Sequence, residues 1–97
     1  MFAIEFAPEA RDDLRALRKN EQVEIVAAVQ VQLQYEPTIE TRNRKRLRPN
    51  EVAEWELRVG KFRALYNVDE DAQKVRVEVI GFKIGHVLFV RGKRREL

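Results

Sequence analysis

Apolar and polar residues alternate at the start of the chain and then recur at helical spacing. Phe2, Ile4 and Phe6 are separated by small or charged residues, the period of two expected of a short strand with one buried face. Apolar residues then recur every three or four positions in two stretches, which predict helices over residues 8–18 and 21–35. The short link between them predicts that the two helices lie antiparallel as a helical hairpin.

The second half of the chain returns to a period of two. Residues 53–68 alternate on both sides of a tight Gly-Lys turn, and this pattern predicts a β-hairpin. Residues 75–80 show the most regular alternation and predict a further strand, while residues 87–90 predict a short last strand. Residues 93–97 follow as a charged tail.

The order of these elements predicts the fold class. One strand and two helices come first and the other strands follow, which is typical of an α+β fold. We therefore expect an N-terminal strand and an α-helical hairpin packed on an antiparallel sheet of three to four strands, with the other face of the sheet free for function. Because 97 residues suit one hydrophobic core, residues 1–97 are expected to form a single domain.

Composition excludes several classes of chemistry. The chain has no cysteine and one histidine, His86, which rules out disulfides, thiolate zinc sites and cysteine nucleophiles, and we expect neither a metal nor a cofactor. No apolar run approaches the roughly 20 residues that span a bilayer, and the N-terminus lacks the features of a signal peptide. We therefore expect a cytoplasmic protein with no membrane contact.

Charge is divided unevenly along the chain. Residues 1–40 carry a net charge of −4, whereas residues 41–97 carry a net charge of +7. Such a division predicts one surface that repels polyanions and another that attracts them. The second half is therefore where we expect a site for an anionic partner.

Two basic stretches in the second half are candidates for contact with nucleic acid. The first lies in residues 38–50, which read as a loop or a frayed edge strand, and the second lies near the C-terminus and includes Arg94 and Arg95. Each stretch fits a surface that follows a phosphate backbone, a solvated segment, or a docking site for an acidic protein. The candidate RNA-binding residues are Arg42, Arg44, Lys45, Arg46, Arg48, Lys83, Arg91 and Lys93.

One segment matches a known family. Residues 55–66 read Trp-Glu-Leu-Arg-Val-Gly-Lys-Phe-Arg-Ala-Leu-Tyr, and they follow Leu47 and precede a Gly85-His86 pair. With the predicted order of elements, this hairpin closely resembles the RelE/ParE superfamily of bacterial toxins over essentially the whole chain. The resemblance implies the toxin of a type II toxin–antitoxin pair, neutralised by a cognate antitoxin. It also implies one of two activities, because RelE-like members cleave mRNA in the ribosomal A site and ParE-like members inhibit DNA gyrase.

The candidate catalytic residues are cations and one histidine. Cleavage of RNA by its own 2′-hydroxyl needs cations beside the phosphate and gains from a side chain that exchanges protons near neutral pH. Arg58, Lys61 and Arg63 lie within one predicted hairpin, and His86 is the single histidine. The resemblance implies the same use of Arg63 and His86, which match a second-strand arginine and a C-terminal histidine of RelE-like nucleases. We assign catalysis to Arg63, Arg58, Lys61 and His86.

The sequence departs from the nuclease pattern at four positions. Basic residues expected on the first strand of the hairpin are replaced by Glu54 and Glu56, and an arginine and a hydroxyl-bearing aromatic residue near the C-terminus are replaced by Val87 and Phe89. We favour a ribosome-dependent endoribonuclease that contacts the ribosome and mRNA. The alternatives are a non-catalytic inhibitor of DNA gyrase and a member that binds only its antitoxin and, through that complex, operator DNA.

Overall fold

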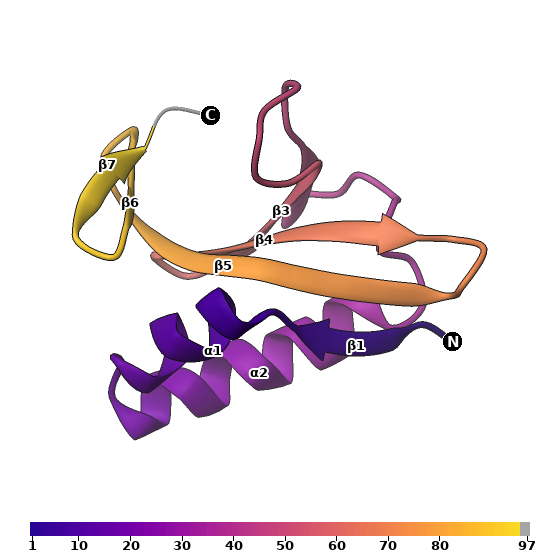
Figure 1. The fold of residues 1–97 in the computed structure, drawn as a ribbon, viewed down its shortest axis with the longest axis horizontal. Helices are drawn as coiled ribbons and strands as arrows, with labels where there is room; N and C mark the ends of the chain where they lie inside the picture. Colours follow the sequence, from indigo (N-terminus) through magenta and orange to yellow (C-terminus); the bar gives the residue numbers. More distant parts are fainter. Residues whose placement is uncertain (96–97) are drawn as a thin grey trace.

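The structure, a computed structural model, describes residues 1–95 and shows two helices packed on a mostly antiparallel sheet (Figure 1). Its elements in chain order are β1 (Ala3–Phe6), α1 (Pro8–Arg15), α2 (Lys19–Leu33), β2 (Arg44–Arg46), β3 (Trp55–Val59), β4 (Phe62–Asp69), β5 (Lys74–Ile84), β6 (Val87–Val90) and β7 (Lys93–Arg95). The α+β class, the N-terminal strand and the helical hairpin predicted from the sequence are confirmed. No helix in the described part of the chain is long and apolar enough to cross a membrane.

The sheet is larger than the sequence pattern indicated. Within the described residues it has seven strands in the order β2-β3-β4-β5-β6-β7, with β1 beside β5, where three to four strands were expected. The basic run forms the edge strand β2, and the predicted charged tail forms β7, although residues 96–97 of that tail lie outside the described residues. The two end strands of this path each consist of three residues, all of them Arg or Lys.

Strand β5 organises the sheet because it pairs along both edges. β4 runs antiparallel along one edge of β5 through most of its length. On the other edge, β1 pairs in parallel with residues 74–77, and β6 pairs antiparallel with residues 82–84. The chain terminus that begins the fold and the hairpin that ends it are therefore held by one strand.

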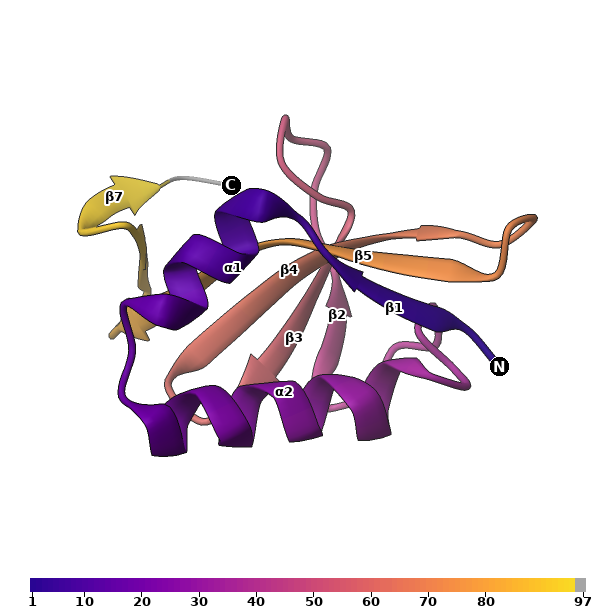
Figure 2. The same cartoon turned by 60° about the horizontal axis from the view of Figure 1, so that its bottom comes forward.

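The main core lies between the helices and one face of the sheet (Figure 2). The buried positions Ile25, Val29 and Leu33 follow the helical spacing of α2 and pack against alternate residues of β3 and β4. Tyr66 is fully buried in this core, and its hydroxyl donates a 2.7 Å hydrogen bond to the carbonyl oxygen of Pro37. Burial raises the pKa of Tyr66, so the hydroxyl stays protonated and keeps this bond.

The opposite face of the sheet is partly covered, which corrects the expectation that it is free. A second apolar cluster on this face contains Ala53, Leu65, Leu88 and Val90. β6 reaches this cluster by bending close over β5 at Gly81, where a Cβ atom would lie 2.6 Å from the carbonyl oxygen of Phe89. The part of this face that stays open therefore lies beside the cluster, where Leu47 and Leu88 border it.

Asp13 joins the first helix to the C-terminal strands. Its carboxylate accepts a 2.9 Å hydrogen bond from the backbone N–H of Ile80 and lies 3.1 Å from Nε of Arg91, in the turn between β6 and β7. Burial raises the pKa of Asp13, and this effect outweighs the opposing influence of the Ile80 hydrogen bond and of Arg91. α1 thus helps to hold the β6–β7 hairpin in place.

Candidate nucleic-acid-binding groove

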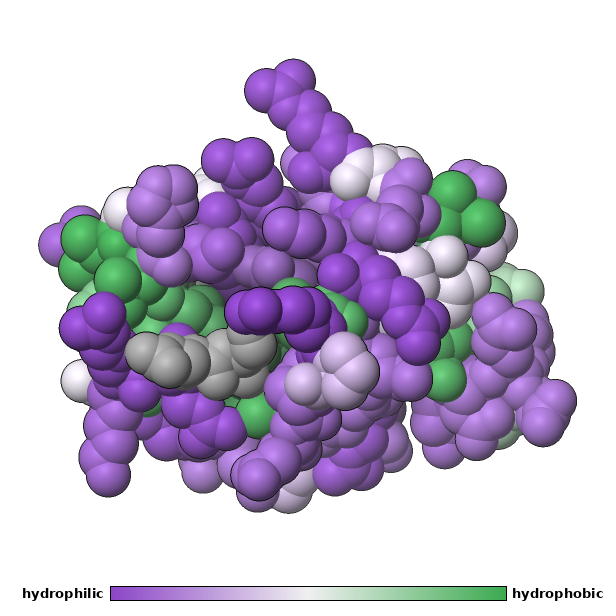
Figure 3. Space-filling model, turned by 90° about the horizontal axis from the view of Figure 1, so that it is seen from above, coloured by the Kyte–Doolittle hydropathy of each residue, from purple (hydrophilic) through white to green (hydrophobic). Residues whose placement is uncertain are grey.

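A groove lined mostly by cations occupies the open part of the face away from the helices, where hydrophilic side chains dominate (Figure 3). Two adjoining hollows share Lys45, Glu56, Lys83 and His86, and we call them together the basic groove. The larger hollow, of about 660 Å³, is lined by Lys45, Arg46, Leu47, Arg48, Glu56, Lys83, His86, Val87, Leu88, Arg94 and Arg95. The smaller is lined by Arg42, Asn43, Lys45, Glu56, Arg58, Arg63, Lys83, Gly85 and His86.

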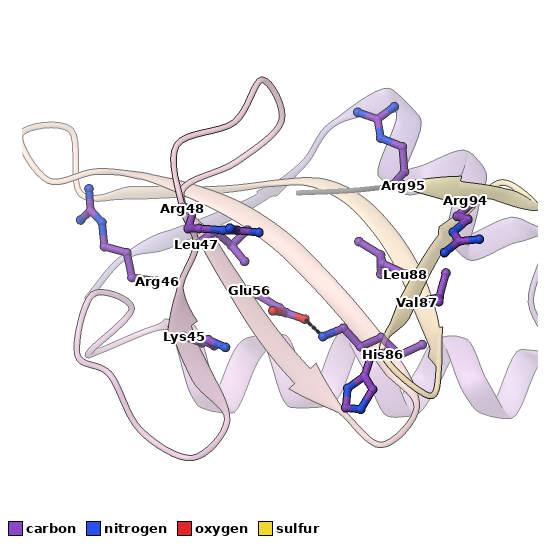
Figure 4. Close-up of a pocket in the computed structure, with 11 residues that line it drawn as sticks. Lys45, Arg46, Leu47, Arg48, Glu56, His86, Val87, Leu88, Arg94 and Arg95 are labelled. Carbon is purple, nitrogen blue, oxygen red and sulfur yellow. Dashed lines mark ion pairs between the residues drawn. The ribbon is translucent and has the colours of Figure 1, made fainter.

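The centre of the groove is assembled from three strands and one turn (Figure 4). The β2–β3 register places Lys45 opposite Glu56, and β5 contributes Lys83 near its end. His86 occupies the two-residue turn between β5 and β6, which Gly85 makes possible by adopting a φ of +60°. Residues that are distant in the sequence therefore surround one space.

Arg63 and Glu56 form a nearly buried ion pair beneath this space. Nε of Arg63 lies 3.1 Å from Oε1 of Glu56, and the two side chains are 10% and 9% exposed. Nη1 of Arg63 also donates 2.8 Å hydrogen bonds to the carbonyl oxygens of Gly60 and Phe62. Burial lowers the pKa of Arg63, and the negative charge of Glu56 opposes this shift. Arg63 is thus a fixed part of the floor, with two of its three nitrogen atoms engaged.

Glu56 is less fully engaged than Arg63. Its Oε1 atom is buried and has no hydrogen bond, because the close approach of the Arg63 nitrogen lacks the alignment that a hydrogen bond requires. Nζ of Lys83 lies 3.8 Å from the same oxygen, and the Lys83 side chain is 33% exposed. The carboxylate therefore interacts with two cations through charge and keeps unused acceptor capacity.

The loop between β2 and β3 carries Arg48 to the edge of the groove. Asn50 braces this loop: its Nδ2 donates to the carbonyl oxygens of Arg48 and Ala53, and its Oδ1 accepts from the backbone N–H groups of Val52 and Ala53. This Asn-centred turn holds the loop over the second apolar cluster. Arg48 is thereby presented from a structured segment.

Eight of the twelve residues predicted to bind or cleave RNA line the groove, and four lie outside it. Arg44 is buried and its guanidinium donates to carbonyl oxygens of Ile39 and Gln32, which ties β2 to the end of α2. Those of the predicted residues that line it are Arg42, Lys45, Arg46, Arg48, Arg58, Arg63, Lys83 and His86.

The other three predicted residues outside the groove are also placed by their neighbours. Nζ of Lys61 lies 3.8 Å from Oε2 of Glu21 on α2, on the helical side of the sheet. Arg91 pairs with Asp13, and Lys93 on β7 is exposed away from both hollows. The two basic stretches therefore do not form continuous binding surfaces, because folding directs some of their side chains into the groove and others away from it.

The groove also contains residues that were not among the candidate site residues, and two of them, Arg94 and Arg95, belong to the second basic stretch. Arg94 and Arg95 line the larger hollow because the β6–β7 hairpin folds back toward it, and the Arg91-Gly92 turn, with both φ angles positive, makes this hairpin possible. Glu56 faces the groove, whereas Glu54 is 57% exposed and pairs with Arg46. The Glu56–Arg63 pair could have been predicted from the sequence, because a hairpin that turns at Gly60-Lys61 makes these residues diagonal neighbours on two adjacent strands.

The remaining departures from the nuclease pattern lie on β6. Val87 lines the larger hollow, and the ring of Phe89 stacks on that of Phe82 with their centroids 5.6 Å apart. Neither side chain offers a proton. Among residues 1–95, no group of three or more His, Cys, Asp or Glu side chains is placed to hold a metal ion.

The arrangement favours binding of a polyanion. Nine Arg or Lys side chains line the two hollows, namely Arg42, Lys45, Arg46, Arg48, Arg58, Arg63, Lys83, Arg94 and Arg95, against one carboxylate, that of Glu56. Cations spread along a groove match the spaced charges of a phosphate backbone. Guanidinium groups add planar, two-pronged recognition of phosphate oxygens.

Comparison with known proteins places this geometry in a family. The model of the family described as the ParE toxin of the type II toxin–antitoxin system, parDE, matches residues 4–87. A chain of the RelBE2 toxin–antitoxin complex of Mycobacterium tuberculosis is similar, with a TM-score of 0.73, 26% identity and coverage of 84% of this chain and 91% of that chain.

A second solved structure shares the fold. A chain of the RelE–RelB complex of the archaeon Pyrococcus horikoshii OT3 superposes with a TM-score of 0.66 at 16% identity, covering 81% of this chain and 91% of that chain. The comparison with curated protein sequences found no match.

Proposed function

This chain belongs to the ParE toxin family of type II toxin–antitoxin systems, and from that premise we propose that its basic groove binds the phosphate backbone of mRNA as a ribosome-dependent endoribonuclease. The observation that carries this proposal is the convergence of cations from β2, β3, β5 and the C-terminal hairpin around one open space that also contains His86. Translation is the process that such an activity would inhibit. The ribosome would supply the remaining contacts that orient the message.

The chemistry follows from the groups in the groove. The 2′-oxygen of a nucleotide attacks the adjacent phosphorus, the bond to the 5′-oxygen breaks, and the products are a 2′,3′-cyclic phosphate and a 5′-hydroxyl. Arg58, Lys45 and Lys83 stabilise the charge on the phosphorus oxygens. His86 donates a proton to the departing 5′-oxygen, while the proton of the attacking 2′-hydroxyl passes to solvent.

A second candidate function is supported by the state of Arg63. The guanidinium that matches the second-strand arginine of RelE-like nucleases is nearly buried, paired with Glu56 and bonded to two carbonyl groups. A protein that inhibits DNA gyrase by binding needs no catalytic set, and Arg63 would then serve only the stability of the sheet. The two functions differ in the role of the groove side chains, which would cleave a phosphodiester bond in the first and only contact the surface of DNA gyrase in the second.

The protein partner that we propose is a cognate antitoxin. The two solved structures compared above are each described as a toxin–antitoxin complex. The outer side of α2 offers an apolar stripe: Val23, Val31 and Tyr35 are 60%, 75% and 68% exposed and lie along one side of the helix with Ala27. Val23, Ala27 and Val31 belong to α2 itself, and Tyr35 continues the stripe two residues beyond its end. Such a stripe suits the apolar face of an amphipathic helix. Operator DNA would be reached through that complex.

The test is induced expression in a bacterial host, with growth measured and new mRNA 5′ ends mapped. We expect growth arrest and codon-phased cleavage, with His86→Ala and Lys83→Ala each lowering cleavage by at least about a hundredfold. Lys61→Ala is the matched control, because it removes one lysine charge outside the groove. Arrest with intact mRNA would instead support gyrase inhibition, and the absence of arrest would support a member that only binds its antitoxin.

A further inference from the structure

Glu56 is an acid at the centre of a site built for anions. It is the one carboxylate among the described residues that line the basic groove, and it lies on the strand between Lys45 and the buried Arg63. Burying a carboxylate costs free energy unless cations and hydrogen bonds compensate, and Oε1 of Glu56 has no hydrogen bond. A residue in this setting calls for an explanation beyond stability.

The two cations beside Glu56 differ in how firmly they are held. Arg63 is 10% exposed, and its Nη1 is fixed by two backbone carbonyl groups, so it cannot leave the carboxylate without losing those bonds. Lys83 is 33% exposed, stands 3.8 Å from the same oxygen and has a flexible stem. Arg63 is therefore a permanent counterion, whereas Lys83 is free to turn toward another anion.

We propose that the carboxylate of Glu56 holds Lys83 in the free protein as an internal substitute for an RNA phosphate, and that RNA binds by taking Lys83 over from Glu56. This inference rests on the proposed function of the groove. A phosphate oxygen and a carboxylate oxygen make equivalent charge-assisted contacts with an ammonium group, so one can replace the other without a change in backbone structure. Glu56 thereby lowers the affinity of the groove for RNA.

Glu54 provides a matched control for Glu56. Glu54 immediately precedes β3, two residues from Glu56, but its side chain is 57% exposed and lines neither hollow. It pairs at 3.5 Å with Arg46, which is itself 57% exposed. Glu54→Gln and Glu56→Gln remove the same charge from positions two residues apart. A general effect of net charge would appear equally in both variants.

The experiment measures binding of a short single-stranded RNA with 2′-O-methyl groups, which the protein cannot cleave, by fluorescence anisotropy at several salt concentrations. We expect Glu56→Gln to tighten binding about fivefold at low salt and Glu54→Gln to change it less than about twofold. In a Lys83→Ala background the gain from Glu56→Gln should disappear, because there is no ammonium group left to release.

Two results would overturn the proposal that Glu56 takes the place of an RNA phosphate: an equal gain in affinity from the two glutamate variants, or a gain from Glu56→Gln that persists in the Lys83→Ala background. Either result would leave the groove as the RNA site. Failure of Lys83→Ala to weaken binding relative to Lys61→Ala would instead overturn the groove as the RNA site. The two failures are therefore distinguishable.

A measurement on the unmodified chain covers the case in which Glu56→Gln does not fold. In protein labelled with ¹³C at glutamate, titration with the same RNA should shift the carboxyl resonance of Glu56 more than that of Glu54. An unmoved Glu56 resonance at RNA concentrations that saturate the anisotropy signal would contradict the proposal.

Discussion

The two faces of the sheet are built from alternate residues of the same strands, yet they are stabilised in different ways. On β3, Trp55, Leu57 and Val59 are buried beneath the helices, whereas Glu56 and Arg58 face the groove. The first face gains its stability from buried apolar area, and the second depends on the nearly buried Glu56–Arg63 ion pair and a small apolar cluster. The difference indicates that most groove side chains are available for binding because the opposite face carries the fold.

The sharpest way to test this comparison is to substitute neighbouring positions on the two faces. Leu57 is fully buried, and Leu57→Ala should lower the free energy of unfolding by about 3 kcal/mol through lost burial and a cavity. Lys45→Ala, on the exposed face of the adjacent strand, should change it by less than about 0.5 kcal/mol while weakening RNA binding. Urea unfolding of both variants provides the measurement. Equal losses of unfolding free energy in the two variants would contradict the conclusion that the helical face carries most of the stability.

Arg63 is the groove residue whose substitution should lower the stability of the fold as much as a substitution in the core. Arg63→Ala leaves the carboxylate of Glu56 buried without its closest cation, so we expect a loss of about 2 to 3 kcal/mol. Adding Glu56→Ala should recover part of that loss, because the buried charge is then removed as well. Arg58→Ala, at the exposed position paired with Arg63 in the hairpin, is the control and should cost little. Thermal unfolding of the three variants distinguishes a structural Arg63 from a freely available one.

The hydroxyl of Tyr66 tests whether the helical face contains any polar contribution to stability. Tyr66→Phe removes the buried hydrogen bond to Pro37 and leaves that carbonyl oxygen unpaired, which should cost about 1.5 kcal/mol. Tyr35→Phe removes an equivalent hydroxyl from an exposed ring and should leave the unfolding free energy almost unchanged. A comparable effect of the two changes would show that the Pro37 contact contributes nothing.

The smallest expected effect concerns pH and the buried Asp13. Because its pKa is raised in the folded chain, the folded state binds more protons than the unfolded state between the two pKa values. The stability that Asp13 contributes is thus fully present below the unfolded pKa and declines as pH rises through the folded one. Asp13→Asn should therefore gain stability relative to the original chain as pH rises from the ordinary Asp value of 3.8 through the raised pKa of the folded chain. Urea titrations across that range measure it, with Asp12→Asn as the control for a charge lost from exposed α1.

Local periodicity was sufficient to predict the elements that depend on it. The alternation through residues 53–68 and the helical spacing of α2 each describe a buried face that repeats along one element, and these features are confirmed. The hairpin register also places Glu56 diagonal to Arg63, so this pair was accessible from the turn alone.

The rest depends on contacts between distant parts of the chain. β7 has three residues without an apolar pattern, and it forms because the turn before it accepts positive φ angles and β6 is already paired with β5. Within one basic run, Arg44 is buried against α2 while Lys45 faces the groove. Charge alone cannot distinguish such neighbours, because a strand directs them to opposite sides.

The composition of the two end strands has a consequence for the protein in concentrated solution. β2 and β7 are the last strands of the sheet within the described residues, and the outer edge of such a strand is a template for a strand from another molecule. Because both strands consist of Arg and Lys, a second copy that approaches edge to edge meets like charge at each end. The same cations that suit the sheet to an anionic partner thus oppose its growth into aggregates, and this protection should weaken as salt screens the charges.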